Sequence, residues 1–125
     1  MPSRSLLFVY GTLKRGCCRS HFLAGQSCLG EARTQPKYRM YNCGTYPGLT
    51  PDAEGLSIHG ELWSVDEACL ARLDQEEGVD EGLYTRSSIE LATPLPESFA
   101  GYPVDAYFYT QSVNEFPDCG DQWVD

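Results

Sequence analysis

Basic residues are scarce in this sequence. The 125 residues include 9 Lys and Arg against 18 Asp and Glu, which gives a formal net charge of -9. Because nonspecific phosphate binding depends on clustered Lys and Arg, this balance argues against nucleic acid or an anionic membrane surface as the main partner. One basic cluster comprises Lys14, Arg15 and Arg19. It is typical of a solvated loop, with the capacity to attract a small anion to the turn beside it.

Long apolar runs are also missing. No early segment pairs a basic start with a signal-length apolar core, and no run approaches the length needed to cross a bilayer. We therefore expect a cytoplasmic protein. A chain of 125 residues without internal repeats suits a single domain, 1–125, that buries a core without metal or disulfide staples.

Clusters with the spacing of metal ligands are few. Cys17, Cys18 and His21 lie close together, but no second Cys/His pair at ligand spacing follows. The other cysteines are Cys28, Cys43, Cys69 and Cys119. In a chain without a secretion signal, all six are expected to stay reduced. We predict no metal site, and a cysteine-based redox or metal protein is the weaker alternative.

An unbroken apolar run occupies residues 6–10 and predicts a strand covered on both faces. Gly11 and Thr12 end it abruptly. Gly11 permits unusual backbone angles and a close approach to the main chain. Free N–H groups in such a turn can bind an anion, although most strands end in an ordinary turn.

Further strands are predicted over residues 28–34, 37–42, 57–63, 84–92 and 104–110, the strand at 57–63 being half-buried. Residues 44–51 are dense in Gly and Pro and predict a loop. Ser20 fits the cap of a short helical turn, and Ser64 with Glu67 fits a capping box before a helix that ends at Gly78. This pattern indicates an α+β domain whose sheet curls into a barrel.

The phase of that helix directs one carboxylate inward. Its apolar stripe contains Cys69, Leu70 and Leu73. At about 100° per residue, Glu77 lies roughly 20° from Leu70, whereas Glu76 lies toward the flank. A desolvated carboxyl has a raised pKa, which a general base near neutrality requires. In the other interpretation, the Glu77 side chain reaches water or nearby N–H groups from a fraying last turn.

Tyrosines supply the remaining candidates. Tyr107 and Tyr109 lie two residues apart and therefore share one face of the last strand, and Tyr84 begins the strand before it. Such tyrosines either pack or donate hydrogen bonds into a cavity. The tail carries Trp123, which we expect to pack back onto the body.

Several of these stretches together resemble a known family. They are VYGTLKRG at 9–16, YPGL at 46–49, LDQEEG at 73–78, LYTR at 83–86 and YFYT at 107–110. In this order they resemble the γ-glutamylcyclotransferase-like family, and the opening run is most similar to its γ-glutamylamine cyclotransferase (AIG2-like) branch. The resemblance implies a small mixed β-barrel with flanking short helices.

The resemblance also implies an activity and a site. The enzyme would act on a γ-glutamylamine or related γ-glutamyl amide, whose α-amine attacks its own γ-carbonyl to release 5-oxoproline and the free amine without a cofactor. Glu77 would be the general acid/base. The loop holding the α-amino acid end and the cavity tyrosines would comprise Tyr10, Gly11, Thr12, Leu13, Tyr84 and Tyr109.

One departure from the family pattern concerns the base. The interval between Glu77 and Tyr84 is long and acidic, with Asp80 and Glu81 in the loop. A shift of one residue would transfer the role to Glu76. The helix phase favours Glu77, and Glu76 is the runner-up. The alternative function is a non-catalytic small-molecule binding module on the same fold. The leaving amine and the oligomeric state stay open.

Overall fold

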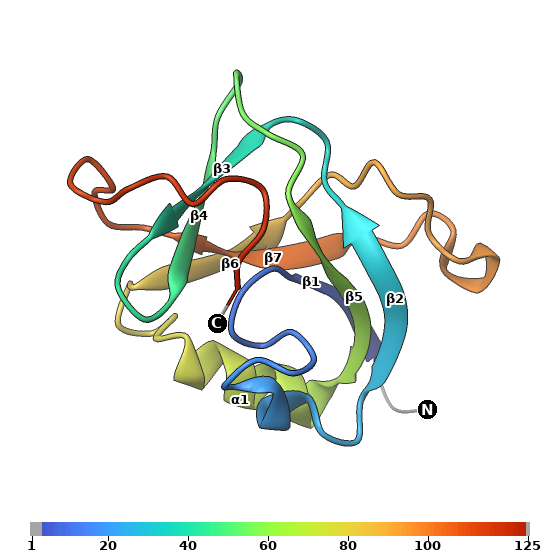
Figure 1. The fold of residues 1–125 in the computed structure, drawn as a ribbon. Helices are drawn as coiled ribbons and strands as arrows, with labels where there is room; N and C mark the ends of the chain where they lie inside the picture. Colours follow the sequence, from blue (N-terminus) through green and yellow to red (C-terminus); the bar gives the residue numbers. More distant parts are fainter. Residues whose placement is uncertain (1–3, 125) are drawn as a thin grey trace.

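A five-stranded mixed sheet forms the centre of the protein (Figure 1). The computed structural model describes residues 4–124. The strands follow the spatial order β2 (Ser27–Arg33), β5 (His59–Asp66), β1 (Arg4–Val9), β7 (Val104–Tyr109) and β6 (Tyr84–Ser88). Strand β1 pairs in parallel with β7, and the other pairs are antiparallel. The first strand of the chain is therefore the middle strand of the sheet.

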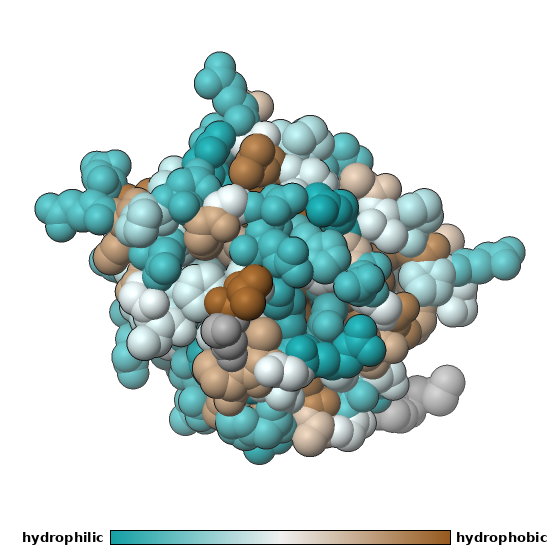
Figure 2. Space-filling model, viewed as in Figure 1, coloured by the Kyte–Doolittle hydropathy of each residue, from teal (hydrophilic) through white to brown (hydrophobic). Residues whose placement is uncertain are grey.

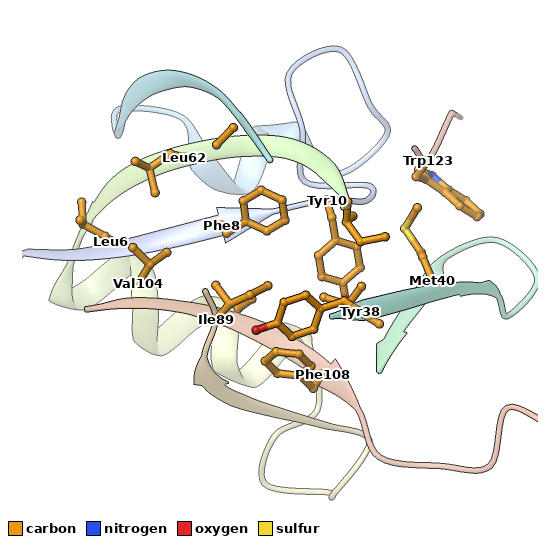
Figure 3. Close-up of a cluster of buried hydrophobic side chains, with 14 residues drawn as sticks. Leu6, Phe8, Tyr10, Tyr38, Met40, Leu62, Ile89, Val104, Phe108 and Trp123 are labelled. Atoms are coloured by element: carbon orange, nitrogen blue, oxygen red, sulfur yellow. The ribbon is translucent and has the colours of Figure 1, made fainter. Parts of the chain in front are cut away.

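The central position of β1 explains its unbroken apolar sequence. Leu6 and Phe8 point into one core cluster, whereas Leu7 and Val9 point into a second cluster on the opposite face of the sheet. Figure 3 shows the first cluster, in which Phe8 and Tyr10 face Phe108 and Met40 from neighbouring elements. Helix α1 (Glu67–Glu76) covers the second face. The prediction of a strand buried on both faces is confirmed.

Strand β7 divides its side chains in the same way. Ala106 and Phe108 belong to the first cluster, and Tyr107 belongs to the second with Tyr109 packed against it. The predicted shared face of the two tyrosines is confirmed. Trp123 is buried in the first cluster, so the tail does pack back onto the body, as Figure 3 shows.

The sheet does not close into a barrel. Among the described residues, β2 and β6 are its two edges and are not hydrogen-bonded to each other. An isolated bridge between Thr34 and Leu91 lies beyond their ends. Strands β3 (Tyr38–Asn42) and β4 (Pro47–Pro51) form a separate two-stranded sheet. The mixed α+β class is correct, but closure into a barrel is wrong.

The predicted loop at residues 44–51 is partly a strand. Pro47 pairs with Asn42, and Pro51 pairs with Tyr38, so the two prolines stand at the ends of β4. A missing N–H donor is tolerated at the ends of an edge strand. The density of Gly and Pro therefore concealed β4.

Helix α1 starts at a different cap from the one predicted. The Asp66 carboxylate accepts a hydrogen bond from the Cys69 N–H at 2.8 Å. Ser64 lies within β5 and accepts from Arg4 Nε at 2.8 Å, so the Ser64–Glu67 capping box is wrong. The helix ends at Glu76, and Gly78 follows at a φ of +68°.

Other elements also differ in detail from the predictions, and most strand bounds shift by one or two residues. Strand β5 runs to Asp66. It is buried on both faces because α1 covers the face that the sequence predicted to be exposed. The strand predicted at 84–92 ends at Ser88. The helical turn at Ser20–Leu23 (η1) is present, but Arg19 occupies its cap position and Ser20 does not cap it. A second short turn, η2, spans Glu97–Phe99.

The outer surface is polar over most of the face seen in Figure 2, with apolar residues in small separate patches. Within residues 4–124, no helix is long and apolar enough to cross a membrane. The tail reaches the loop that follows β1, where Lys14 Nζ donates to the carbonyl of Trp123 (Figure 1). This loop, the C-cap of α1 and nearby residues of β4, β6 and β7 frame the candidate site.

Candidate active site

A pocket opens where β1 ends. Its void measures about 360 Å³, counting the part open to solvent. Half of the lining residues come from the end of β1 and its following turn. The rest come from the loop before η1, the β3–β4 region, the C-cap of α1 and strands β6 and β7. The lining residues are Phe8, Val9, Tyr10, Gly11, Thr12, Leu13, Arg19, Tyr46, Pro47, Glu77, Tyr84 and Tyr107.

The floor of the pocket includes a tight turn. The N–H of Lys14 donates to the carbonyl of Gly11 at 3.1 Å, and the N–H of Arg19 donates to the carbonyl of Thr12 at 2.9 Å. The bond that closes the turn leaves the N–H groups of its central residues, Thr12 and Leu13, for other acceptors. The turn therefore presents successive donors of the kind that bind a carboxylate.

Gly11 is required because another segment of the chain packs closely against its main chain. It does not adopt a positive φ. A Cβ atom at this position would lie 2.5 Å from Cγ of Pro47, well inside van der Waals contact. The glycine thus lets the turn pack against β4. Of the two roles that the sequence allowed for Gly11, a close approach to its main chain applies, here by Pro47, and a positive φ does not.

Glu77 points into the pocket from the C-cap of α1. Its residue exposure is 8%, whereas Glu76 is exposed to solvent. Burial raises the pKa of the Glu77 carboxyl, the Arg19 guanidinium opposes this rise, and Glu76 adds to it. The structure therefore brings Glu77 and the Gly11–Leu13 turn to one cavity, and it turns Glu76 away.

Arg19 is the site residue that sequence reasoning missed. Its Nη1 lies 3.6 Å from Oε1 of Glu77, and its guanidinium lies 5.4 Å from the centre of the Phe22 ring. Its side chain is 26% exposed. Only its place in a basic cluster marked it in the sequence, and that cluster was assigned to a solvated loop.

The other two cations of that cluster turn away from the pocket. Lys14 is buried, and its Nζ donates to the carbonyl of Trp123 at 2.6 Å. Arg15 pairs with the buried carboxylate of Glu61 at 3.1 Å. The assignment of a solvated basic loop is therefore wrong for Lys14 and Arg19, because the chain folds these side chains against distant segments.

Three of the pocket tyrosines already donate their hydroxyl protons to protein acceptors. Tyr10 donates to the carbonyl of Tyr107 at 2.5 Å, and Tyr84 donates to the carbonyl of Pro47 at 2.6 Å. Tyr107 donates to Oδ1 of Asp74 at 2.7 Å. Burial raises the pKa of all three hydroxyls. Their rings shape the pocket, and their oxygens retain acceptor capacity.

Tyr109 does not line the pocket. It pairs with Tyr84 across β6 and β7, and the two ring centres are 5.4 Å apart. Tyr107, one step along the same face, occupies the lining instead. Tyr109 therefore lies beside Tyr84 and outside the pocket lining, not in the cavity position that the resemblance implied.

A charged network holds the helix that carries Glu77. Arg86 Nε and Nη2 contact the two carboxylate oxygens of Asp74 at 2.9 and 3.1 Å, and Nη1 contacts Asp105 at 2.9 Å. Asp74 also accepts from Tyr107. Bidentate Arg–carboxylate pairs have a fixed geometry. The network therefore ties the last turns of α1 to β6 and β7.

Within the described part of the chain, no group of three or more His, Cys, Asp and Glu residues is arranged to hold a metal ion. The chemistry of the pocket rests on one buried carboxylate, one guanidinium and the donors of a turn. A pocket with these groups, in a small α+β domain, is chemically suited to a compact polar molecule.

The comparisons with known proteins place this domain in a family. The family model described as "Gamma-glutamyl cyclotransferase, AIG2-like" matches residues 7–125. The chain belongs to this family. A Vibrio cholerae protein that is named provisionally as a γ-glutamylcyclotransferase is 38% identical over 116 residues, which are 93% of each chain. The Escherichia coli K12 γ-glutamylcyclotransferase family protein YtfP is 38% identical over 68 residues, 54% of this chain and 58% of that protein.

Solved structures show the same fold. The solution structure of YtfP from Escherichia coli has 29% identity and a TM-score of 0.69, with 96% of each chain covered. The crystal structure of an AIG2-like protein from Mus musculus has 24% identity and a TM-score of 0.74, covering 94% of this chain and 87% of that chain. The likeness to the mouse protein concerns the fold alone.

Proposed function

We propose that this protein is a γ-glutamylcyclotransferase that acts on a γ-glutamylamine or related γ-glutamyl amide and releases 5-oxoproline and the free amine. One observation carries the proposal: the buried carboxylate of Glu77 and the Gly11–Leu13 turn line the same pocket. The Glu77 carboxylate supplies a base, and the turn supplies N–H donors that hold the reacting molecule. Membership of the γ-glutamylcyclotransferase family supports the same conclusion.

The turn holds the α-carboxylate of the substrate. The N–H groups of Thr12 and Leu13 are directed to this anion, and the rings of Tyr10, Tyr84 and Tyr107 confine the glutamyl chain. Cyclisation requires this chain to be bent so that the α-amine meets the γ-carbonyl. Well-oriented intramolecular reactions reach effective molarities of about 10⁵–10⁸ M. Orientation is thus a main source of rate.

Glu77 moves the protons. An ammonium cannot attack a carbonyl, so Glu77 accepts a proton from the α-nitrogen, which then bonds to the γ-carbon. The bond between that carbon and the leaving nitrogen breaks as Glu77 returns a proton to the leaving group. Overall the α-nitrogen loses two protons and the leaving nitrogen gains two. Glu77 carries the first proton from one nitrogen to the other, and a further exchange at Glu77 carries the second. No water or redox partner is consumed.

The raised pKa of Glu77 suits both halves of this task. A carboxyl whose pKa is close to the working pH both accepts and returns a proton readily. Burial is the main cause of the rise, and the Arg19 guanidinium limits it. The Glu77 carboxylate is therefore a better proton acceptor than an exposed glutamate.

The proposal is tested by incubating the protein with a panel of γ-glutamyl amides and measuring 5-oxoproline by mass spectrometry. We expect turnover by the wild-type protein and a loss of about 10²–10⁴-fold in kcat for Glu77→Gln. The matched control is Glu76→Gln, which makes the same change in charge at the exposed neighbour. Binding of these amides without release of 5-oxoproline would instead establish a non-catalytic binding module.

A further inference from the structure

Arg19 is the one cationic side chain among the described residues that line the pocket. It comes from the loop before η1, and its main-chain N–H is fixed to the carbonyl of Thr12 at 2.9 Å. Its side chain then crosses to Glu77 and remains 26% exposed. The main chain of Arg19 is thus fixed, and its guanidinium is accessible to a molecule bound in the pocket.

The contact with Glu77 leaves the guanidinium donors available. The 3.6 Å separation from Glu77 is that of an ion pair, and it is longer than a hydrogen bond. The planar fork of an arginine offers five N–H donors and matches a carboxylate in two places. Contact with the Phe22 ring restricts the side chain without using those donors.

Few other donors in the pocket are free to recognise an anion. The hydroxyls of Tyr10, Tyr84 and Tyr107 already donate to protein acceptors. Lys14 is committed to the carbonyl of Trp123. Among the described lining residues, Arg19 is the side chain with a full positive charge, so we expect anion recognition to rest chiefly on Arg19 and the turn.

We propose that Arg19 is a specificity-determining residue that binds a carboxylate of the substrate, together with the turn that ends β1. This inference rests on the proposed function, because Glu77 marks where the reacting α-amine lies. The α-carboxylate is attached to the same carbon as that amine. A guanidinium 3.6 Å from the Glu77 carboxylate is therefore close to the α-carboxylate of the bound molecule. A leaving amino acid would provide a second source of the carboxylate.

Three substrates distinguish the two sources. They are γ-glutamylethylamine, γ-glutamylalanine, which adds a carboxylate to the leaving group, and the decarboxylated analogue of γ-glutamylethylamine, which lacks the α-carboxylate. For Arg19→Gln we expect a fall of about 10- to 100-fold in kcat/KM on γ-glutamylethylamine, as for a lost hydrogen bond to a charged group. The analogue should be affected less than threefold, on the order of experimental scatter in such cycles. A fall confined to γ-glutamylalanine would assign the carboxylate to the leaving group.

Two further variants separate recognition from structural damage. Arg19→Lys keeps the charge but loses the planar fork, so its loss should be intermediate. Arg72→Gln removes a positive charge from the exposed face of α1 and should leave all three substrates unaffected. An equal loss by Arg19→Gln on all three substrates, with or without a lower melting temperature, would overturn the proposal, because Arg19 would then act through Glu77 or the fold.

A binding measurement keeps the test independent of turnover. γ-Glutamylethylamine is titrated by calorimetry into Glu77→Gln and into the double variant with Arg19→Gln. Weaker binding by about 10- to 100-fold in the double variant supports carboxylate recognition, even if the wild-type protein releases no 5-oxoproline. Equal binding by the two proteins would overturn it. Failure of catalysis and failure of recognition are thus distinguished.

Discussion

An alanine at position 11 should damage the pocket more than it damages the fold. Its Cβ would lie 2.5 Å from Cγ and 3.0 Å from Cδ of Pro47, whereas carbon atoms in contact normally stand about 3.5–4.0 Å apart. The turn or Pro47 must therefore move by about 1 Å. Overpacking of this kind costs about 1–3 kcal/mol of stability. A misplacement of about 1 Å in a binding group can cost about 10²-fold in rate.

The assay compares two quantities for each variant: the free energy of unfolding from urea titrations and kcat/KM for 5-oxoproline release. A matched control is Gly16→Ala, because Gly16 has a φ of +81° and a Cβ atom there would meet no other atom within 4 Å. This backbone effect costs about 1–2 kcal/mol. Gly16→Ala should therefore lose similar stability and retain its rate.

A second substitution should relieve the collision. Pro47→Ala removes Cγ and Cδ, and the remaining Cβ lies 4.0 Å from the new methyl group, an ordinary contact. The hydrogen bond from Tyr84 persists, because it goes to the main-chain carbonyl of residue 47. The double variant should thus be more active than Gly11→Ala alone. Wild-type behaviour of Gly11→Ala, or no gain in the double variant, would refute the packing argument.

Two further predictions concern pH and the helix cap. Because burial raises the pKa of Glu77, its contribution to stability is present below the ordinary glutamate pKa and is lost as pH rises through the raised value. Melting curves should show that Glu77→Gln removes this pH-dependent loss of stability and raises the melting temperature at neutral pH. In a separate rate measurement, wild-type kcat/KM should rise with pH through the same pKa. Asp66→Ala should cost about 0.5–2 kcal/mol in urea unfolding as a lost N-cap, and an unchanged midpoint would contradict the assigned cap.

Local sequence patterns were sufficient for several parts of the site. The apolar run before Gly11 required a strand with both faces covered, because alternate side chains point to opposite sides. The apolar stripe of α1 placed Glu77 inward and Glu76 outward, because helix periodicity is a property of neighbouring residues. The shared face of Tyr107 and Tyr109 followed from the period of a strand.

Long-range contacts decided the rest, since periodicity does not report which distant segments meet. The contact between Arg19 and Glu77 depends on how the loop after β1 folds back over α1. The need for glycine at position 11 comes from Pro47, in a strand that its prolines concealed. Strand pairing also placed Tyr107 in the pocket lining and Tyr109 beside Tyr84, outside that lining. The sequence by itself thus determined which way Glu77 points, and the tertiary structure decided what faces it.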